Sequence, residues 1–138
     1  MAFVLDASVT IAWAFEAEAN PVSQEAWRRC FELYEDVEAP SLWWFEIRNS
    51  LIVNERRQRI TPARTAGFLK ALASLPLALD RQIEDSALLG LARDQGLTVY
   101  DAAYLELAQR KGLALATLDK ALAVAARASG VPLVGVAP

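Results

Sequence analysis

Short apolar segments alternate with longer segments of helical spacing along the whole chain, and this alternation limits the fold more than any other feature of the sequence. Apolar runs bounded by turn residues are typical of buried strands, whereas apolar residues three and four apart indicate helices. Strands that alternate with helices favour a mostly parallel sheet covered by helices on both faces. Strands are expected at 2–5, 37–39, 77–79, 113–116 and 132–136, and helices at 8–15, 22–35, 40–58, 62–74, 83–95, 101–111 and 118–128.

The predicted fold is therefore an α/β domain with helices on both sides of the sheet, and residues 1–138 are expected to form one domain. The composition, 54% hydrophobic and 22% charged, argues against disorder. A single cysteine, Cys30, excludes an intramolecular disulfide. No uncharged apolar run reaches the length of about 18 residues that a membrane span needs, and the short apolar N-terminus lacks the basic flank of a signal peptide. We expect a cytoplasmic protein.

The sequence contains no histidine, and this absence removes whole classes of chemistry. Ser-His-Asp and Cys-His catalysis, histidine acid–base cleavage of RNA and imidazole metal sites are all excluded. Hydrolytic chemistry would have to depend on carboxylates, hydroxyls, lysine or arginine, and hard metal ions.

Four of the 17 acidic residues occupy positions where α/β proteins bind ligands. Asp6 directly follows the first strand and Asp119 follows the strand at 113–116, while Asp101 opens a helix. Ligands in such folds bind beyond the carboxyl ends of the strands. Glu46 lies in the first turns of the long helix, with Asn49 on the same face at i+3. Asp101 or Asp119 taken singly is equally well explained as a carboxylate that stabilises a helix N-terminus, so spacing alone leaves a shared site and separate helix caps both open.

If the four carboxylates do converge, they require a cation, because like charges a few ångströms apart cannot all stay ionised without one. All-oxygen ligands of this kind suit Mg²⁺ or Mn²⁺, and Asp6, Asp101 and Asp119 are the expected metal ligands. Ser8 and Thr117 flank the first and last aspartates, and their hydroxyls could support a ligand, a water or a phosphate oxygen, or act only as helix caps.

At these same residues the sequence resembles the PIN-domain family, and within it the VapC-type toxins of bacterial toxin–antitoxin pairs. The similarity runs in order over essentially the whole chain. A lone Asp-Ala-Ser would be a weak signal, but the Y-D-A-A-Y-L-E-L-A block together with the later T-L-D is a strong one. The matching stretches are 4–8, 39–42 leading to Glu46 and Asn49, 97–108, and 115–119.

The resemblance implies a PIN-like three-layer α/β/α fold with a mostly parallel five-stranded sheet, a homodimer, and Mg²⁺- or Mn²⁺-dependent endoribonuclease activity. It assigns the family's acidic positions to Asp6, Glu46, Asp101 and Asp119, and it implies a small antitoxin protein as partner of the RNA-cleaving chain. Two alternatives stay open: a PIN-like nuclease that acts in RNA maturation or on DNA with no toxin role, and a non-catalytic domain whose aspartates bind a regulatory ion.

Two surface features bear on partners. The net charge of −3 does not indicate a nucleic-acid binder, so RNA binding would need bound metal or a local basic patch. The arginines of 56–59, with Arg48 earlier in the same helix, are either helix C-terminal cations or such a patch. The segment 42–53 is apolar on nearly every side of its helix, which predicts an oligomer or partner interface that Trp13 and Phe15 could extend.

Overall fold

A four-stranded parallel sheet lies at the centre of the structure, a computed structural model that describes residues 2–136. Its strands are β1 (Phe3–Leu5), β2 (Val37–Pro40), β3 (Leu77–Asp80) and β4 (Ala114–Ala116). They lie in the order β3-β2-β1-β4, and each neighbouring pair is parallel. β1 is an inner strand and its residues are completely buried. Asp6, the residue that follows β1, is therefore buried as well.

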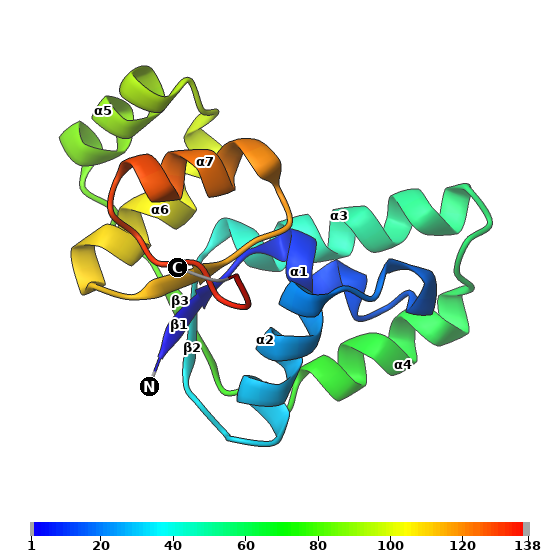
Figure 1. Ribbon diagram of the computed structural model, residues 1–138. Coiled ribbons are helices and arrows are strands. Elements are labelled where there is room, and N and C mark those ends of the chain that lie inside the picture. The colour runs from blue at the N-terminus through cyan, green and yellow to red at the C-terminus, as the bar shows by residue number, and fades with distance from the viewer. Residues whose placement is uncertain (1, 137–138) are drawn as a thin grey trace.

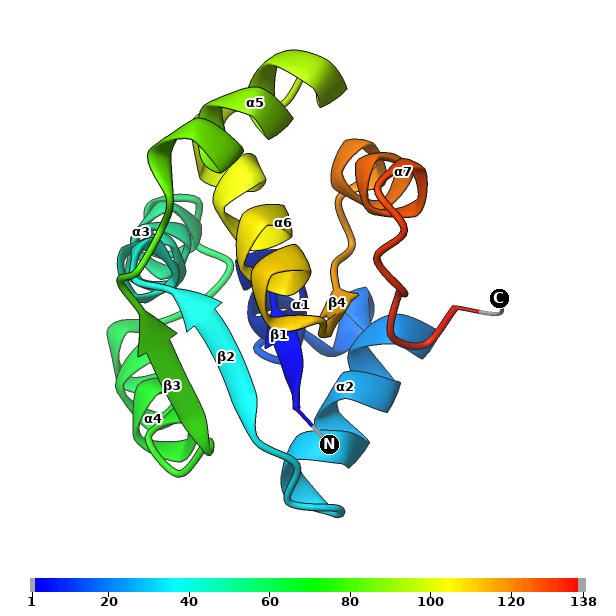
Figure 2. The ribbon, with the colours of Figure 1, turned by 90° about the vertical axis from the view of Figure 1, so that its left-hand side faces the viewer.

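Helices cover both faces of this sheet, so the predicted α/β/α layering is confirmed. Figures 1 and 2 show α5, α6 and α7 on one side of the strands and α1 to α4 on the other. None of the described helices is long and apolar enough to cross a membrane. The helices are α1 (Ala7–Ala12), α2 (Pro21–Phe31), α3 (Leu42–Arg56), α4 (Pro62–Leu72), α5 (Asp85–Gln95), α6 (Val99–Lys111) and α7 (Lys120–Ala128), with a short 3₁₀ turn η1 (Glu16–Glu18).

The expected fifth strand at 132–136 is wrong. Only Leu133 pairs with the sheet there, in an isolated parallel bridge to Leu115. Gly135 turns the chain away with a φ of 73°, and a Cβ at this position would lie 2.9 Å from Val22 Cα in α2. After the single bridge at Leu133, the segment therefore bends toward the backbone of α2. Only a glycine at position 135 allows the two backbones to come this close.

Two helix starts also differ from the sequence expectation. Ser8 is not the N-cap of α1, because the helix already begins at Ala7 and Asp6 occupies the cap position. Helix α6 begins at Val99 rather than at Asp101, since the Thr98 hydroxyl accepts a hydrogen bond from the Asp101 amide at 3.1 Å. Asp101 thus lies in the first turn of α6.

Helix α6 is the most deeply buried helix and carries two residues of the candidate site. Seven consecutive residues, from Ala102 to Ala108, are buried between the sheet on one side and α5 and α7 on the others. Near its C-terminal end, Arg110 donates to Asp80 at 2.6 Å and to Glu106 at 2.7 Å. Both acids are almost fully buried, so this network ties α6 to the edge strand β3.

Replacing Arg110 with methionine should destabilise the protein, because two buried carboxylates would lose their cation. Breaking a buried ion pair from one side costs about 3–5 kcal/mol, and since the Arg110 side chain is 25% exposed we expect the lower end of that range. Urea unfolding at neutral pH measures the effect. Arg127→Met, at an exposed position in α7, should change the free energy of unfolding by less than about 0.5 kcal/mol. Equal stabilities of the two variants would contradict a stabilising role of the network.

Candidate active site at the carboxyl edge of the sheet

Asp6 leaves the end of β1 and is held in place by two hydroxyl groups. Its Oδ2 accepts hydrogen bonds from Ser8 Oγ and Thr117 Oγ1, each at 2.7 Å. Thr117 can reach it because β4, which ends at Ala116, pairs directly with β1. The Asp6 side chain is only 5% exposed. Burial raises the pKa of this carboxyl, the two hydroxyl groups partly oppose the rise, and the nearby charge of Asp101 adds to it.

The same two hydroxyls position the segment that carries Asp119. Thr117 Oγ1 accepts from the Asp119 amide at 3.0 Å, and Ser8 Oγ accepts from the Leu118 amide at 2.9 Å. Asp119 in turn caps α7, since its Oδ1 accepts from the Leu122 amide at 2.9 Å. Ser8 and Thr117 therefore connect the ends of β1 and β4 at the site, and Asp119 combines the role of helix cap with a place beside the other acids.

Glu46, in the second turn of α3, reaches the site from the opposite side and contacts Tyr104 of α6. The Tyr104 hydroxyl donates to Glu46 Oε1 at 2.5 Å, and the tyrosine is completely buried. Burial raises the pKa of Glu46, the tyrosine hydroxyl lowers it, and the charges of Asp6 and Asp101 raise it further. Burial also raises the pKa of Tyr104, as do the charges of Asp6 and Glu46, so the hydroxyl stays protonated and remains a donor.

Asp101, one turn before Tyr104 on α6, completes the group. Burial raises the pKa of its carboxyl, and repulsion by Asp119 raises it further, while Thr98 lowers it. Asp101 acts electrostatically on Asp6 and Glu46 as well. The structure thus brings the four acids predicted from the sequence into one electrostatically coupled cluster. Asn49 lies one turn beyond Glu46 and is exposed, and no hydrogen bond within 2–136 joins it to the cluster.

Comparison with known proteins agrees with this architecture. The family model for the PIN domain matches residues 3–128. The chain belongs to the PIN-domain family. The resemblance to this family seen in the sequence is confirmed by this match, and the resemblance to its VapC-type members is confirmed by a relative that bears that name.

Two relatives of this PIN domain come from Pyrobaculum aerophilum. The first is named ribonuclease VapC3 and is 32% identical over 126 residues, which are 89% of this chain and 93% of the relative. The second is the crystal structure of PAE2754, which superposes with a TM-score of 0.69 at 26% identity and covers 91% of this chain and 84% of the other. The relatives therefore match nearly the full length of this chain.

The PIN domain implies a divalent metal, and the donor set of the cluster fits one. Glu46 Oε1 and Asp119 Oδ1 are occupied by protein donors. The second carboxylate oxygen of each accepts no hydrogen bond from the part of the chain that the structure describes. Within that part, no three acidic side chains are close enough to enclose an ion. Mg²⁺ usually binds one or two carboxylates and keeps several waters, so an open oxygen-rich cluster suits it.

Tyr104 is a site residue that the sequence analysis missed. Within the Y-D-A-A-Y-L-E-L-A block its aromatic ring reads as one more apolar residue of a buried helix. A signal was nevertheless present, because Tyr104 lies at i+3 from Asp101 and a buried tyrosine hydroxyl usually needs a partner. That partner, Glu46, is 58 residues away in the chain.

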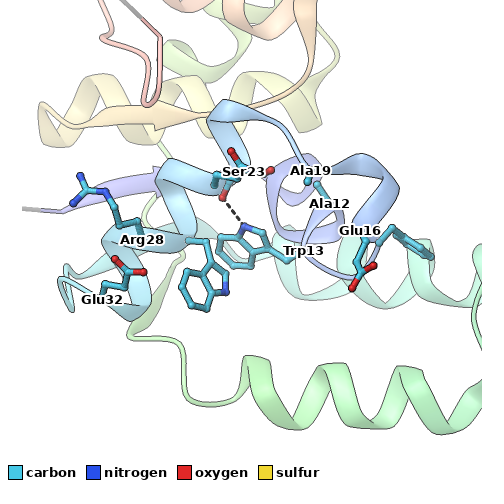
Figure 3. Close-up of a pocket in the computed structure, with 10 residues that line it drawn as sticks. Ala12, Trp13, Glu16, Ala19, Ser23, Arg28 and Glu32 are labelled. Atoms are coloured by element: carbon cyan, nitrogen blue, oxygen red, sulfur yellow. Dashed lines mark hydrogen bonds between the residues drawn. The ribbon is translucent and has the colours of Figure 1, made fainter.

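A mainly apolar pocket of the PIN domain lies elsewhere, between α1 and α2. It has a volume of about 440 Å³, and none of the four clustered acids lines it. Figure 3 shows Trp13 at its centre, with the indole nitrogen donating to the Ser23 carbonyl oxygen at 2.8 Å. The pocket is thus a feature of the packing of α1 against α2, separate from the carboxylate cluster.

The raised pKa values predict that the cluster costs stability in the absence of metal. A carboxyl whose pKa is higher in the folded than in the unfolded state binds more protons when folded, so stability falls as pH rises through the range between the two values. Asp101→Asn should therefore raise the melting temperature in EDTA at neutral pH by a few degrees, with the difference shrinking as the pH is lowered below the usual carboxyl range.

Thermal melting in EDTA from pH 3 to pH 8 provides the test. Asp36→Asn is the matched control, because Asp36 is exposed and lies outside the cluster. If Asp101→Asn and Asp36→Asn follow the same pH profile, the carboxylates do not repel one another in the folded protein.

Proposed function

We propose that this chain is a metal-dependent endoribonuclease and the toxin of a toxin–antitoxin pair. The observation that carries the proposal is the cluster of Asp6, Glu46, Asp101 and Asp119 at the carboxyl edge of the sheet, where burial and mutual repulsion raise the pKa values of three of the acids. Perturbed carboxylates in one place indicate a functional site. The name of the relative ribonuclease VapC3 supports RNA as the substrate and an antitoxin protein as the partner.

Asp6, Asp101 and Asp119 are the residues that would hold Mg²⁺ or Mn²⁺, one or two of them directly and the rest through water. Such an ion, when bound, supplies a water of lowered pKa and stabilises the charge that develops on the phosphate. Ser8 and Thr117 hold Asp6 Oδ2 and so fix the orientation of this carboxylate. Water attack needs a base, and in this chain without histidine the carboxylates of the cluster can supply one.

Glu46 is the residue best placed to take that proton. Its Oε1 is held by the Tyr104 hydroxyl at 2.5 Å, which fixes the carboxylate and leaves Oε2 for a water. The raised pKa of Glu46 improves it as a base, because efficiency increases as the pKa approaches the working pH. The proton that leaves the water would therefore be held at Glu46 Oε2.

Asp6→Asn, Asp101→Asn and Asp119→Asn should each reduce metal-dependent RNA cleavage by at least about a hundredfold, because each keeps the side-chain volume and removes one ligand charge. Cleavage of a mixed RNA pool with Mg²⁺, Mn²⁺ or EDTA is the measurement. Wild-type rates in any two of the folded variants would refute the assignment of the site.

Metal binding should also stabilise the wild-type protein. At a hundredfold excess of metal over its dissociation constant, the melting temperature should rise by several degrees, which corresponds to about 2.7 kcal/mol.

We further propose that the chain forms a homodimer through the outer face of α3. The helix buries Trp43, Ile47 and Leu51 in the core, as the all-round apolar pattern requires. Its outer face exposes an aromatic pair, since Phe45 is 70% and Trp44 is 42% exposed with ring centroids 5.1 Å apart. Exposed apolar patches of this kind mark interaction surfaces. Trp13 and Phe15, by contrast, pack partly against the core.

Phe45→Lys should convert the dimer to a monomer, because it places a charge in the middle of the proposed interface. Light scattering at tens of micromolar gives the molar mass. Val124→Lys is the matched control, since Val124 is 64% exposed on α7, which Figure 2 shows on the opposite side of α6 from α3. A monomeric wild-type protein would exclude the interface and leave the nuclease proposal intact.

A further inference from the structure

Four of the 14 basic residues of this acidic chain lie in one short segment that contains no acid. Residues 56–64 contain four arginines and no acid, and all 17 acidic residues of the chain lie outside it. The segment joins the C-terminal end of α3 to the first turn of α4. Figure 1 shows this turn at the right-hand end of the molecule, away from α5 and α7. Charge segregation on this scale creates a local positive potential despite the negative net charge.

All four arginines are exposed, and we call three of them, Arg56, Arg57 and Arg64, the arginine tip. No acidic group of residues 2–136 lies within ion-pair distance of them. The fourth arginine differs, because Arg59 contacts Glu18 at 2.9 Å and Asn54 Oδ1 at 2.8 Å and lies over the ring of Phe15. Arg59 therefore fastens the turn to η1 and leaves the arginine tip projecting into solvent.

Helix dipoles account for part of the arginine tip but not for all of it. Arg56 and Arg57 lie at the C-terminal end of α3, where a cation is favourable. Arg64 occupies the third position of α4, after the cap Thr61 and after Pro62. A cation is unfavourable there, and an acidic or glutamine side chain is the residue that stabilises this position. The positive charge of Arg64 thus opposes helix stability, and it requires an explanation outside the helix.

The arginine tip is aligned with the candidate active site along α3. Arg57 follows Glu46 by eleven residues, which is close to three helical turns, so both lie on the same side of the helix. At about 1.5 Å per residue the separation is about 16 Å. An RNA strand that passes over the carboxylate cluster and follows this side of α3 would reach the arginine tip within a few nucleotides.

We propose that the arginine tip binds the phosphate backbone of the RNA substrate, a few nucleotides away from the bond that is cut. This inference rests on the proposed ribonuclease function and names the surface that retains the RNA. The carboxylate cluster itself repels phosphate, so the cations that hold the strand must lie at a distance from it. Arginines outside ion pairs are suited to this role, because guanidinium groups bind phosphate oxygens in a bidentate manner.

The test is the salt dependence of RNA binding by the Arg57→Gln/Arg64→Gln variant. A labelled oligouridylate is titrated with the full chain in EDTA, where no metal-dependent cleavage occurs, over a range of salt concentrations. Each arginine that neutralises a phosphate of a single strand should add about 0.7 to the slope of log K against log salt, so removing two should reduce the slope by about 1.4. In the presence of metal, the KM of the double variant for oligouridylate should rise severalfold.

Arg93→Gln/Arg127→Gln is the matched control. It removes the same charge from two exposed arginines that lie in the last turns of α5 and α7. The proposal requires the control to keep the wild-type slope and KM. An equal reduction of the slope in both variants would mean that only net charge matters, and it would overturn the proposal.

Two further outcomes would also overturn it. One is an unchanged slope of log K against log salt in the tip variant. That result would show that these arginines do not contact RNA phosphates, and it would favour an acidic protein segment as their partner. The other is a wild-type protein that does not bind oligouridylate in EDTA. Failure of the ribonuclease proposal is a separate result, since it would appear as an absence of metal-dependent cleavage by the wild-type protein, whereas the binding measurement needs no catalysis.

Discussion

The buried carboxylate of Asp6 is the constraint on which the site depends. Removing an ionised carboxylate from water is costly unless hydrogen bonds compensate for the lost solvent. Here the compensation comes from Ser8 and Thr117, whose hydroxyls both donate to Oδ2 at 2.7 Å. Thr117 can donate only because β1 and β4 are adjacent, parallel and in a register that pairs Leu5 with Ala116. The order of the strands in the sheet is therefore a condition for the chemistry at its edge.

The other acids depend on α6 in the same way. Asp101 and Tyr104 lie one turn apart on this helix, so a single rigid element presents an acid to Asp6 and a hydroxyl to Glu46. Seven consecutive buried residues and the Arg110 network fix the helix against the sheet. The carboxylates repel one another, and this repulsion acts against the packing of α6. The rigid packing of α6 therefore helps to keep the acids together.

Local sequence signals were sufficient for most of the fold, but grouping the four acids into one site needed the resemblance to the PIN-domain family. Asp6 follows β1 directly and Asp119 comes three residues after the end of β4, and both positions lie at the carboxyl edge of the sheet. Contacts between distant segments could not be found in this way. The hydrogen bond of Tyr104 depends on a residue 58 positions away. The absence of a fifth strand depends on the close approach of Gly135 to α2, which no local pattern of residues 132–136 reveals.

Net charge was a poor guide to this surface, and the structure gives the reason. Several basic residues are neutralised where they stand: Arg59 by Glu18, Arg110 by Asp80 and Glu106, and Lys111 by Glu38. These cations stabilise the fold and add little to the external field. The arginine tip carries charge that no ion pair within residues 2–136 neutralises, and at Arg64 the charge is unfavourable to the helix. An acidic chain can therefore present a local cationic surface, because a phosphate responds to the charges within about a Debye length rather than to their sum over the molecule.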